Sequence, residues 1–285
     1  MIDLHLHTNL SDGDLSPSEL ISQINIRDIT YVSVTDHNHS LFYDELKYIG
    51  NLIKPKLITG CEIATSYNRT IIEILGYNVD VNKINSWYKK FYSQENLIKN
   101  EIFLFNTLLD LCKKNNLKIT EDISLSNIIK GCSKKIIYQD LIKHESNNSK
   151  FDLSSYKAFF RKELSNPESK LFLNEALTYP SLEDVIELIH NSDGLTFLAH
   201  PFEYNIKNLD SLIYHLTNKN YINGIECFHP SATTNNSKFL LDYCKIYNIF
   251  SSAGSDFHSF KKSHSLGVSI NDSLVNSSQF SWLKI

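Results

Sequence analysis

The sequence Met1-Ile-Asp-Leu-His-Leu-His-Thr-Asn-Leu-Ser-Asp-Gly13 decides how the rest of the chain is interpreted. Its first seven residues have the alternation of a strand, in which successive side chains point to opposite faces. Apolar side chains then face one way, and Asp3, His5 and His7 face the other. Two imidazoles spaced i, i+2 can bind one metal ion, and Asp12, in the Ser-Asp-Gly turn, can add a carboxylate. The alternative is a surface strand with two exposed histidines.

The composition indicates one large α/β domain or a main domain with an insertion. The chain has 285 residues, of which 42% are hydrophobic, and a net formal charge of −4, which gives no bulk attraction to nucleic acid or to an anionic membrane. We expect neither a membrane span nor a signal peptide, because no long apolar run or leader occurs. Five scattered cysteines, none in a C-x-x-C pair, favour reduced thiols and a cytoplasmic location.

Both ends of the chain alternate between strand-like and helix-like segments. Ser16-Pro-Ser-Glu19 has the form of a capping box and predicts a helix to about Ile26, and a second helix is expected over 41–53. Strands are predicted over several apolar stretches, namely 29–34, 56–63, 70–76, 194–200, 224–229 and 249–258. Repeated βα units imply a mainly parallel sheet with its chemistry at the carboxyl ends of the strands.

The middle of the chain has a different character. Residues 82–179 lack strand signals and are typical of amphipathic helices, such as 96–115 and 153–164. We therefore expect one domain formed by 1–81 and 180–285, with 82–179 as a helical insertion that covers an active site. The alternative is an independent helical domain.

Ten imidazole or carboxylate side chains lie at predicted strand ends or alone within an apolar strand. They are His5, His7, Asp12, His37, Glu62, Glu73, His200, His229, Asp256 and His258. Six histidines at equivalent strand ends are hard to explain by core packing, since each buried imidazole needs a polar partner. A donor set without thiolate favours Mn, Fe or Zn, and its size predicts two or three divalent ions. His39 is expected at the surface.

Six motifs, taken in order, resemble the PHP (polymerase and histidinol phosphatase) superfamily. They are Asp3-Leu-His5-Leu-His7 with Ser11-Asp12-Gly13, Thr35-Asp36-His37-Asn38, Gly60-Cys61-Glu62-Ile63, Ala199-His200-Pro201, Glu226-Cys-Phe-His229-Pro230 and Gly254-Ser-Asp256-Phe-His258. The chain is most similar to stand-alone phosphoesterases of this superfamily, including 3′,5′-nucleoside bisphosphate phosphatases and related 5′-to-3′ exoribonucleases. The resemblance implies a distorted (β/α)7 barrel with a helical insertion and a di- or trinuclear metal site.

The resemblance also implies how the metals are distributed. One ion would take His5, His7, Glu62 and Asp256. Glu62 would bridge to a second ion held by His200, and a third would take Asp12, His37 and His258. Glu226 and Asp36 are expected to orient ligands rather than to bind metal.

Two positions depart from the family pattern. A family histidine is replaced by Glu73, which can still ligate a hard ion but could instead mark a lost metal. The phosphate-binding arginine of the insertion is replaced by the pair Lys134 and Lys135, which we predict to contact the substrate. The alternative is that both lysines are simply solvated.

The expected function is that of an enzyme hydrolysing phosphomonoesters, such as a nucleotide or nucleoside bisphosphate, by attack of a metal-bridging hydroxide. The predicted catalytic residues are His229, Asp256 and His37, with His229 as phosphate contact or proton donor to the leaving oxygen. Alternatives are exonucleolytic cleavage of short single-stranded RNA or DNA, and a non-catalytic barrel that binds a partner. Histidinol phosphate phosphatase activity is a weaker alternative. The sequence predicts no membrane partner and no particular oligomeric state.

Overall fold

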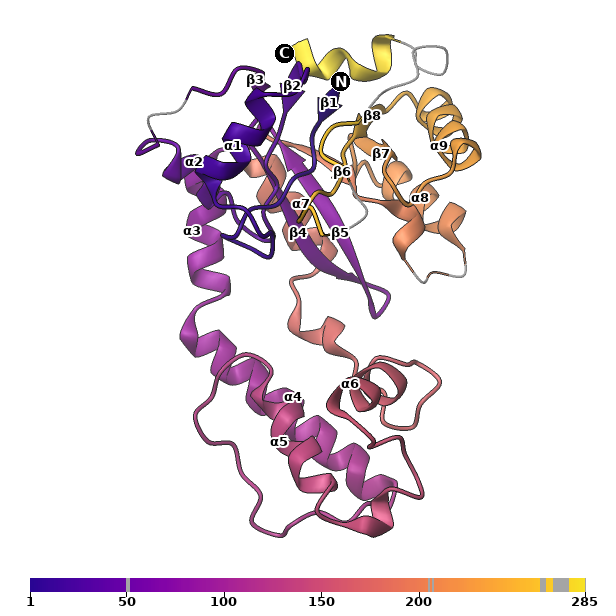
Figure 1. Cartoon of the computed structure of the whole chain (residues 1–285). Coiled ribbons are helices and arrows are strands. Elements are labelled where there is room, and N and C mark those ends of the chain that lie inside the picture. Colours follow the sequence, from indigo (N-terminus) through magenta and orange to yellow (C-terminus); the bar gives the residue numbers. More distant parts are fainter. Residues whose placement is uncertain (50–51, 205, 207, 262–264, 269–276, 285) are drawn as a thin grey trace. The chain divides into compact units, whose positions relative to one another are not determined.

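The chain forms two compact units in the computed structural model, which describes residues 1–49, 52–204, 206, 208–261, 265–268 and 277–284 (Figure 1). The main unit comprises Met1–Tyr88 and Tyr179–Ile285, and the helical unit comprises Lys89–Thr178. The first boundary therefore lies inside helix α3 (Val81–Phe91), seven residues beyond the sequence-based boundary at 81. The role of the helical unit as a lid stays a prediction.

The strands of the main unit belong to two sheets within a mixed α/β fold. Three short parallel strands form the first sheet, β1 (Ile2–Asp3), β2 (Tyr31–Val32) and β3 (Lys56–Leu57). Five strands form the second in sequence order, β4 (Gly60–Tyr67), β5 (Thr70–Tyr77), β6 (Leu195–Leu198), β7 (Gly224–Phe228) and β8 (Phe250–Ala253). No closed sheet is assigned among the described residues, so the predicted (β/α)7 barrel is not established by these strand pairings.

The second sheet is less parallel than the sequence led us to expect. Strand β5 pairs antiparallel with both β4 and β6, and only β6, β7 and β8 are parallel. The cause is the two-residue connection between β4 and β5, where Asn68 and Arg69 have φ of 46° and 64°. So short a loop joins only antiparallel strands, and positive φ at both residues is typical of a hairpin turn.

Backbone hydrogen bonds connect segments of the two sheets at two places. Leu4 N donates to Ala253 O at 3.0 Å, which joins the end of β1 to β8. On the other side, Asn38 N donates to Glu62 O at 2.6 Å, which joins the segment after β2 to β4. The first bond places the segment with His5 and His7 beside β8, and the second places the segment with His37 beside Glu62.

Helices cover the strands of the main unit. They are α1 (Pro17–Asn25), α2 (Leu41–Glu45), the first part of α3, α7 (Leu182–Asn191), α8 (Leu209–Asn218) and α9 (Thr234–Tyr247). The capping box is confirmed, since Ser16 Oγ and Glu19 each bond the other's backbone amide. The helix expected over 41–53 is wrong in length, because α2 ends at Glu45. Apolar residues of β4–β8 and α7–α9 form the largest core.

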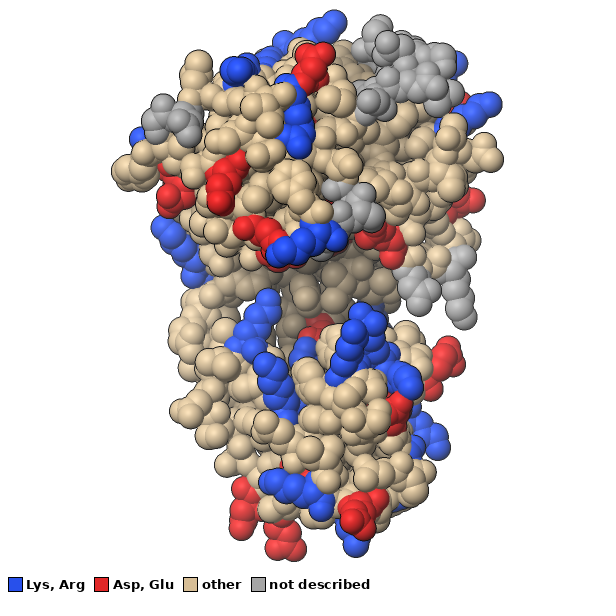
Figure 2. Space-filling view, in the orientation of Figure 1, with Lys and Arg blue, Asp and Glu red and all other residues tan. Residues whose placement is uncertain are grey.

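The helical unit has a separate apolar core. Helix α4 (Gln94–Lys114) buries Leu104, Leu108 and Cys112 along one face, against residues of α5 (Cys132–Leu141). A short α6 (Tyr156–Ala158) continues into a π-helical turn over Phe159–Leu164. The unit contains 15 Lys and Arg and 11 Asp and Glu residues, a net formal charge of +4 in a chain of −4. Figure 2 shows lysine and arginine side chains spread over one of its faces.

Among the helices that the structure describes, none combines the length and the apolar character that crossing a membrane requires.

Candidate metal centre

The strand predicted over the first seven residues is shorter in the structure, where β1 ends at Asp3, and the extended segment that follows brings two imidazoles into the interior of the main unit. His5 and His7 are both fully buried, and their Nε2 atoms lie 3.1 Å apart. The strand is held from both sides, because Ser33 N donates to Asp3 O and His7 N donates to Phe257 O. The alternative of an exposed surface strand is therefore wrong.

Glu62 is the centre of the cluster. Its Oε2 lies 3.2 Å from His5 Nε2, 3.3 Å from His7 Nε2 and 3.1 Å from His37 Nδ1. Its Oε1 lies 2.9 Å from His200 Nε2. Residues from four separate parts of the chain thus converge on one buried carboxylate.

Asp256 and Asp12 extend the cluster. Asp256 Oδ1 lies 3.1 Å from His7 Nε2, and its backbone has φ of 50°, in the left-handed region that Asp tolerates better than most residues. Asp12, whose side chain is 52% exposed, places Oδ1 3.2 Å from His258 Nε2 and 3.6 Å from His37 Nε2. One face of the cluster is therefore open to solvent.

Glu73 joins the cluster from strand β5. Its Oε2 lies 3.4 Å from His200 Nε2, and its Oε1 lies 3.8 Å from His37 Nδ1. Burial and the negative charge of Glu62 raise the pKa of Glu73 to about 7. The side chain thus points to the cluster rather than to solvent, as ligation would require.

The remaining pKa shifts show how strongly these groups interact. Burial alone would raise the pKa of Glu62, but the imidazoles of His5 and His37 hold it well below its usual range. Burial likewise opposes charge on His37 and His200, yet mainly the contacts with Glu62 raise the pKa of each to about 9. Without metal, the site would hold protons that a cation must displace.

Several donor atoms of the cluster lack hydrogen-bond partners, and their spacing suits coordination of divalent metal ions. His7 Nδ1, Glu62 Oε2 and His200 Nδ1 are buried without a hydrogen-bond partner among the described residues. Ligand atoms about 2.0–2.2 Å from one ion lie about 3–3.5 Å from each other, the range found around Glu62 Oε2. Nearby Cys61 is not expected to compete, since burial raises its pKa to about 12.

All nine residues predicted as ligands lie in groups whose donor atoms are within 4.8 Å of one another. The four groups are His7, Asp12, His37 and His258; His5, His7 and Asp256; His5, Glu62 and His200; and His37, Glu62 and Glu73. Such a donor set, imidazole and carboxylate without sulfur, suits Mn, Fe or Zn. Their assignment to particular ions stays a prediction.

Hydrogen bonds distinguish the roles of individual histidines. His5 Nδ1 donates to Glu226 Oε1 at 3.0 Å, and His258 Nδ1 donates to Asp256 O at 2.8 Å. In the neutral rings, Nε2 is then left with a lone pair directed at the cluster, the usual arrangement of a metal-binding histidine.

His229 has the opposite tautomer. Its Nδ1 accepts from Ser231 N at 3.1 Å, so in the neutral ring the proton lies on Nε2, 3.8 Å from Asp256 Oδ2. His229 belongs to none of the four donor groups. Its arrangement suits a hydrogen-bond or proton donor rather than a ligand.

Three further buried carboxylates tie the ligand-bearing segments together. Asp3 accepts from Ser255 N and Gly267 N, which fixes the backbone just before Asp256. Asp36 accepts from Thr8 N and from Ser11 Oγ, in the loop that leads to Asp12. Glu226 accepts from His200 N as well as from His5. Asp3 was assigned no role from the sequence, although the alternation of β1 placed it on the face of His5.

The structure also shows the surroundings of His39 and of the lysine pair Lys134 and Lys135. His39 is buried rather than at the surface, and its ring bonds Leu10 O and Leu41 N, so its role is structural. Lys134 lies in the helical unit, where its Nζ is 2.7 Å from Glu175 Oε2 and 5.1 Å from the ring centre of Phe160. Lys135, next to it on α5, is exposed.

Comparison with known proteins gives the same family. Residues 3–232 match the model of the PHP domain. A 5′-3′ exoribonuclease of Haemophilus influenzae is 25% identical over 90% of this chain and 89% of its own length. A 3′,5′-nucleoside bisphosphate phosphatase of Chromobacterium violaceum is 22% identical over 90% of this chain and 87% of its own length. The fold is also similar to a solved structure described as an amidohydrolase from Chromobacterium violaceum with bound sulfate. The match has a TM-score of 0.64 at 18% identity and covers 95% of this chain and 92% of that one.

Proposed function

Because the chain belongs to the PHP domain family of metal-dependent phosphoesterases, we propose that it hydrolyses phosphomonoesters of nucleotides. The observation that carries the proposal is Glu62 Oε2, a buried carboxylate oxygen that meets three imidazole nitrogens at 3.1–3.3 Å and bonds none of them. The names of relatives, a nucleoside bisphosphate phosphatase and an exoribonuclease, support a nucleotide as the substrate.

We assign the ligands to two or three ions. One would be held by His5, His7, Glu62 and Asp256, and a second by Glu62, Glu73 and His200. A third would be held by Asp12, His37 and His258. Such ions supply positive charge that stabilises the transferring phosphoryl group and lowers the pKa of a water nucleophile.

Within this scheme the chain's own residues position and protonate the substrate. Glu226 fixes the ring orientation of His5, and Asp3 fixes the backbone that precedes Asp256. His229 holds a proton at Nε2 close to Asp256, where it can donate to the oxygen of the leaving alcohol.

We propose that lysines of the helical unit bind a second phosphate group of the substrate. The exposed ammonium of Lys135 can meet an anion without losing another partner among the described residues, whereas Lys134 must first leave Glu175. We also keep the lid role of this unit as a proposal. The hydrogen bonds from Leu4 to Ala253 and from Asn38 to Glu62 support a closed seven-stranded barrel.

A second candidate function is exonucleolytic cleavage of short single-stranded RNA. The net charge of +4 on the helical unit favours it, since phosphate neutralisation dominates affinity for nucleic acid. The same metal centre would serve both reactions.

The test is turnover of adenosine 5′-monophosphate and of a 5′-labelled RNA hexanucleotide by the purified protein. We expect exhaustive chelation to abolish activity and Mn²⁺ to restore it. Release of phosphate from the mononucleotide alone would favour the phosphatase, and stepwise release of mononucleotides from RNA would favour the exonuclease. Equal turnover by protein shown to be metal-free would overturn the proposal.

A further inference from the structure

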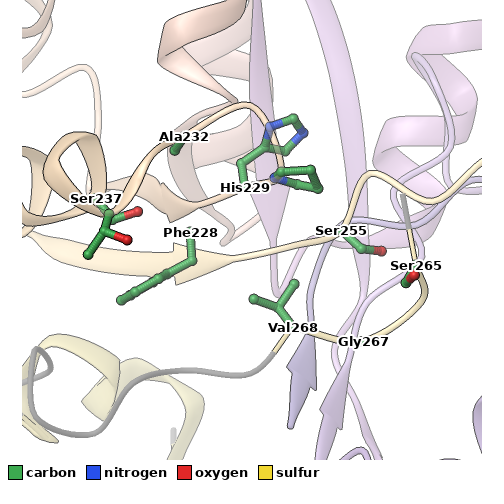
Figure 3. A pocket seen from close by; sticks show the side chains of 10 residues that line it. Phe228, His229, Ala232, Ser237, Ser255, Ser265, Gly267 and Val268 are labelled. Atoms are coloured by element: carbon green, nitrogen blue, oxygen red, sulfur yellow. The ribbon is translucent and has the colours of Figure 1, made fainter. Parts of the chain in front are cut away.

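A cavity of about 410 Å³ in the main unit is lined by ten of the described residues, which Figure 3 shows. Its walls come from the end of β7 with the turn that follows, from the start of α9, and from the segments around Ser255 and Gly267. A volume of this size is within the range of small-molecule binding sites, about 300–1,000 Å³.

Among the described residues, the ten that line the cavity include no acid, lysine or arginine, and His229 is their one titratable side chain. Thr234, Ser237 and Ser265 supply hydroxyl groups, while Phe228 and Val268 supply apolar surface. Burying a charged phosphate against such a wall without a counter-charge would be costly. The lining suits an uncharged group with both apolar and hydrogen-bonding surface.

The cavity also adjoins the proposed reacting centre. His229 is part of its wall, and His229 Nε2 lies 3.8 Å from Asp256 Oδ2 in the metal centre. Ser255, which immediately precedes Asp256, is also part of the wall, and its hydroxyl donates to Asp3 Oδ2 at 2.7 Å. His229 therefore lies between the proposed metal centre and this cavity.

We propose that this cavity binds the nucleoside of the substrate, as the leaving group of the phosphomonoester. The inference rests on the proposed function and deepens it, because it assigns the two halves of a nucleotide to two parts of the main unit. The apolar side chains of Phe228 and Val268 would face the base, and the hydroxyl groups would meet polar atoms of the ribose and base.

The test fills the cavity with a larger side chain. Ala232 lines the cavity and lies in the turn after β7, so Ala232→Phe places a ring inside it. The matched control is Asn235→Phe, at an exposed position of α9 next to Thr234 that is not part of the wall. Thr234→Phe, also in the wall, is the second variant if circular dichroism shows that Ala232→Phe does not fold.

Two readouts are compared, the KM for adenosine 5′-monophosphate relative to that for methyl phosphate, and adenosine binding by equilibrium dialysis without metal. Ala232→Phe should raise the KM ratio and weaken adenosine binding by roughly tenfold or more, the effect of losing about 1.4 kcal/mol of contacts. Asn235→Phe should change neither.

Failure of this inference is distinguishable from failure of the proposed function. An unchanged KM ratio in both cavity variants, with active enzyme, would overturn the nucleoside site and leave the phosphatase intact. If the wild type hydrolyses neither substrate, the proposed function is wrong, and adenosine binding measured by dialysis still tests the nucleoside site. Equal adenosine binding by wild type and Ala232→Phe, or no binding by either, would then refute the nucleoside site.

Discussion

The two units of the molecule bury carboxylates for different purposes. In the helical unit, Glu101 accepts from Gly131 N and Ser133 N, and Asp140 accepts from Thr120 N and Thr120 Oγ1. In the main unit, Glu62 Oε2 faces three imidazole nitrogens and has no hydrogen bond among the described residues. A buried charge must be compensated. Backbone amides compensate it in the helical unit, whereas imidazole side chains surround it in the main unit.

The comparison predicts its largest effect at the centre of the cluster. Glu62→Gln keeps the side-chain volume and removes the charge that the ions share. We expect a fall of about 10²–10³-fold in kcat, the scale of removing one group that stabilises the transition-state charge, together with a lower metal content. Elemental analysis and phosphate-release kinetics on the same preparations check this. The matched control, Glu101→Gln, should leave the metal content of the chain unchanged.

A smaller effect is expected from Glu226, which bonds two of the predicted ligand histidines. Glu226→Gln keeps an acceptor for His200 N but weakens the bond to His5 Nδ1. Metal affinity, measured by competition with a chromophoric chelator, should fall by about 10–100-fold. Saturating Mn²⁺ should restore most of the turnover. If affinity is normal while turnover stays low, Glu226 does not act through the ligands.

In the helical unit, Glu101→Gln tests the structural use of a buried carboxylate. Loss of its charge-assisted bonds to the start of α5 should cost about 1.5–3 kcal/mol of unfolding free energy. Burial alone would raise the pKa of Glu101, but bonds from Ser133 and Gly131 hold it below its usual value. This stabilisation is present above the unfolded pKa of about 4.3 and is lost as the pH falls through the lower folded value.

Denaturant unfolding of wild type and Glu101→Gln at neutral and acidic pH measures this difference. The gap in unfolding free energy should close as the pH is lowered below about 4. A gap that widens with acid would show that Glu101 is not charged in the folded protein.

The clustering of the predicted ligand residues could be expected from the sequence, because side chains of an extended segment alternate between two faces and the ends of neighbouring parallel strands meet at one edge of a sheet. His5, His7 and the residues of later strand ends could be placed on one site for that reason. Contacts between distant segments were not predictable in the same way. The ion pair of Lys134 with Glu175 and the burial of His39 depend on packing that no local pattern encodes. The antiparallel direction of β5 follows from the two-residue turn at Asn68 and Arg69, which the repeated βα pattern did not predict.

The smallest effect concerns the paired lysines of the helical unit. Lys135→Ala should raise the KM for a nucleoside 3′,5′-bisphosphate by up to roughly tenfold, the scale of one charge-assisted contact. Lys134→Ala should act less on KM and more on the unfolding free energy, because Lys134 is paired with Glu175. Kinetics with the bisphosphate and with methyl phosphate separate the two roles. An equal change in KM for both substrates would show that Lys135 does not bind the second phosphate.

We propose that the clustered carboxylate and imidazole groups of the main unit form a multinuclear metal centre, and anomalous X-ray diffraction tests this most directly. Crystals of protein loaded with Mn²⁺ are measured above and below the manganese absorption edge. We expect two or three anomalous peaks among the nine predicted ligands, with one peak next to Glu73 and His200. Anomalous density that is absent from this cluster, or that lies elsewhere on the chain, would contradict it.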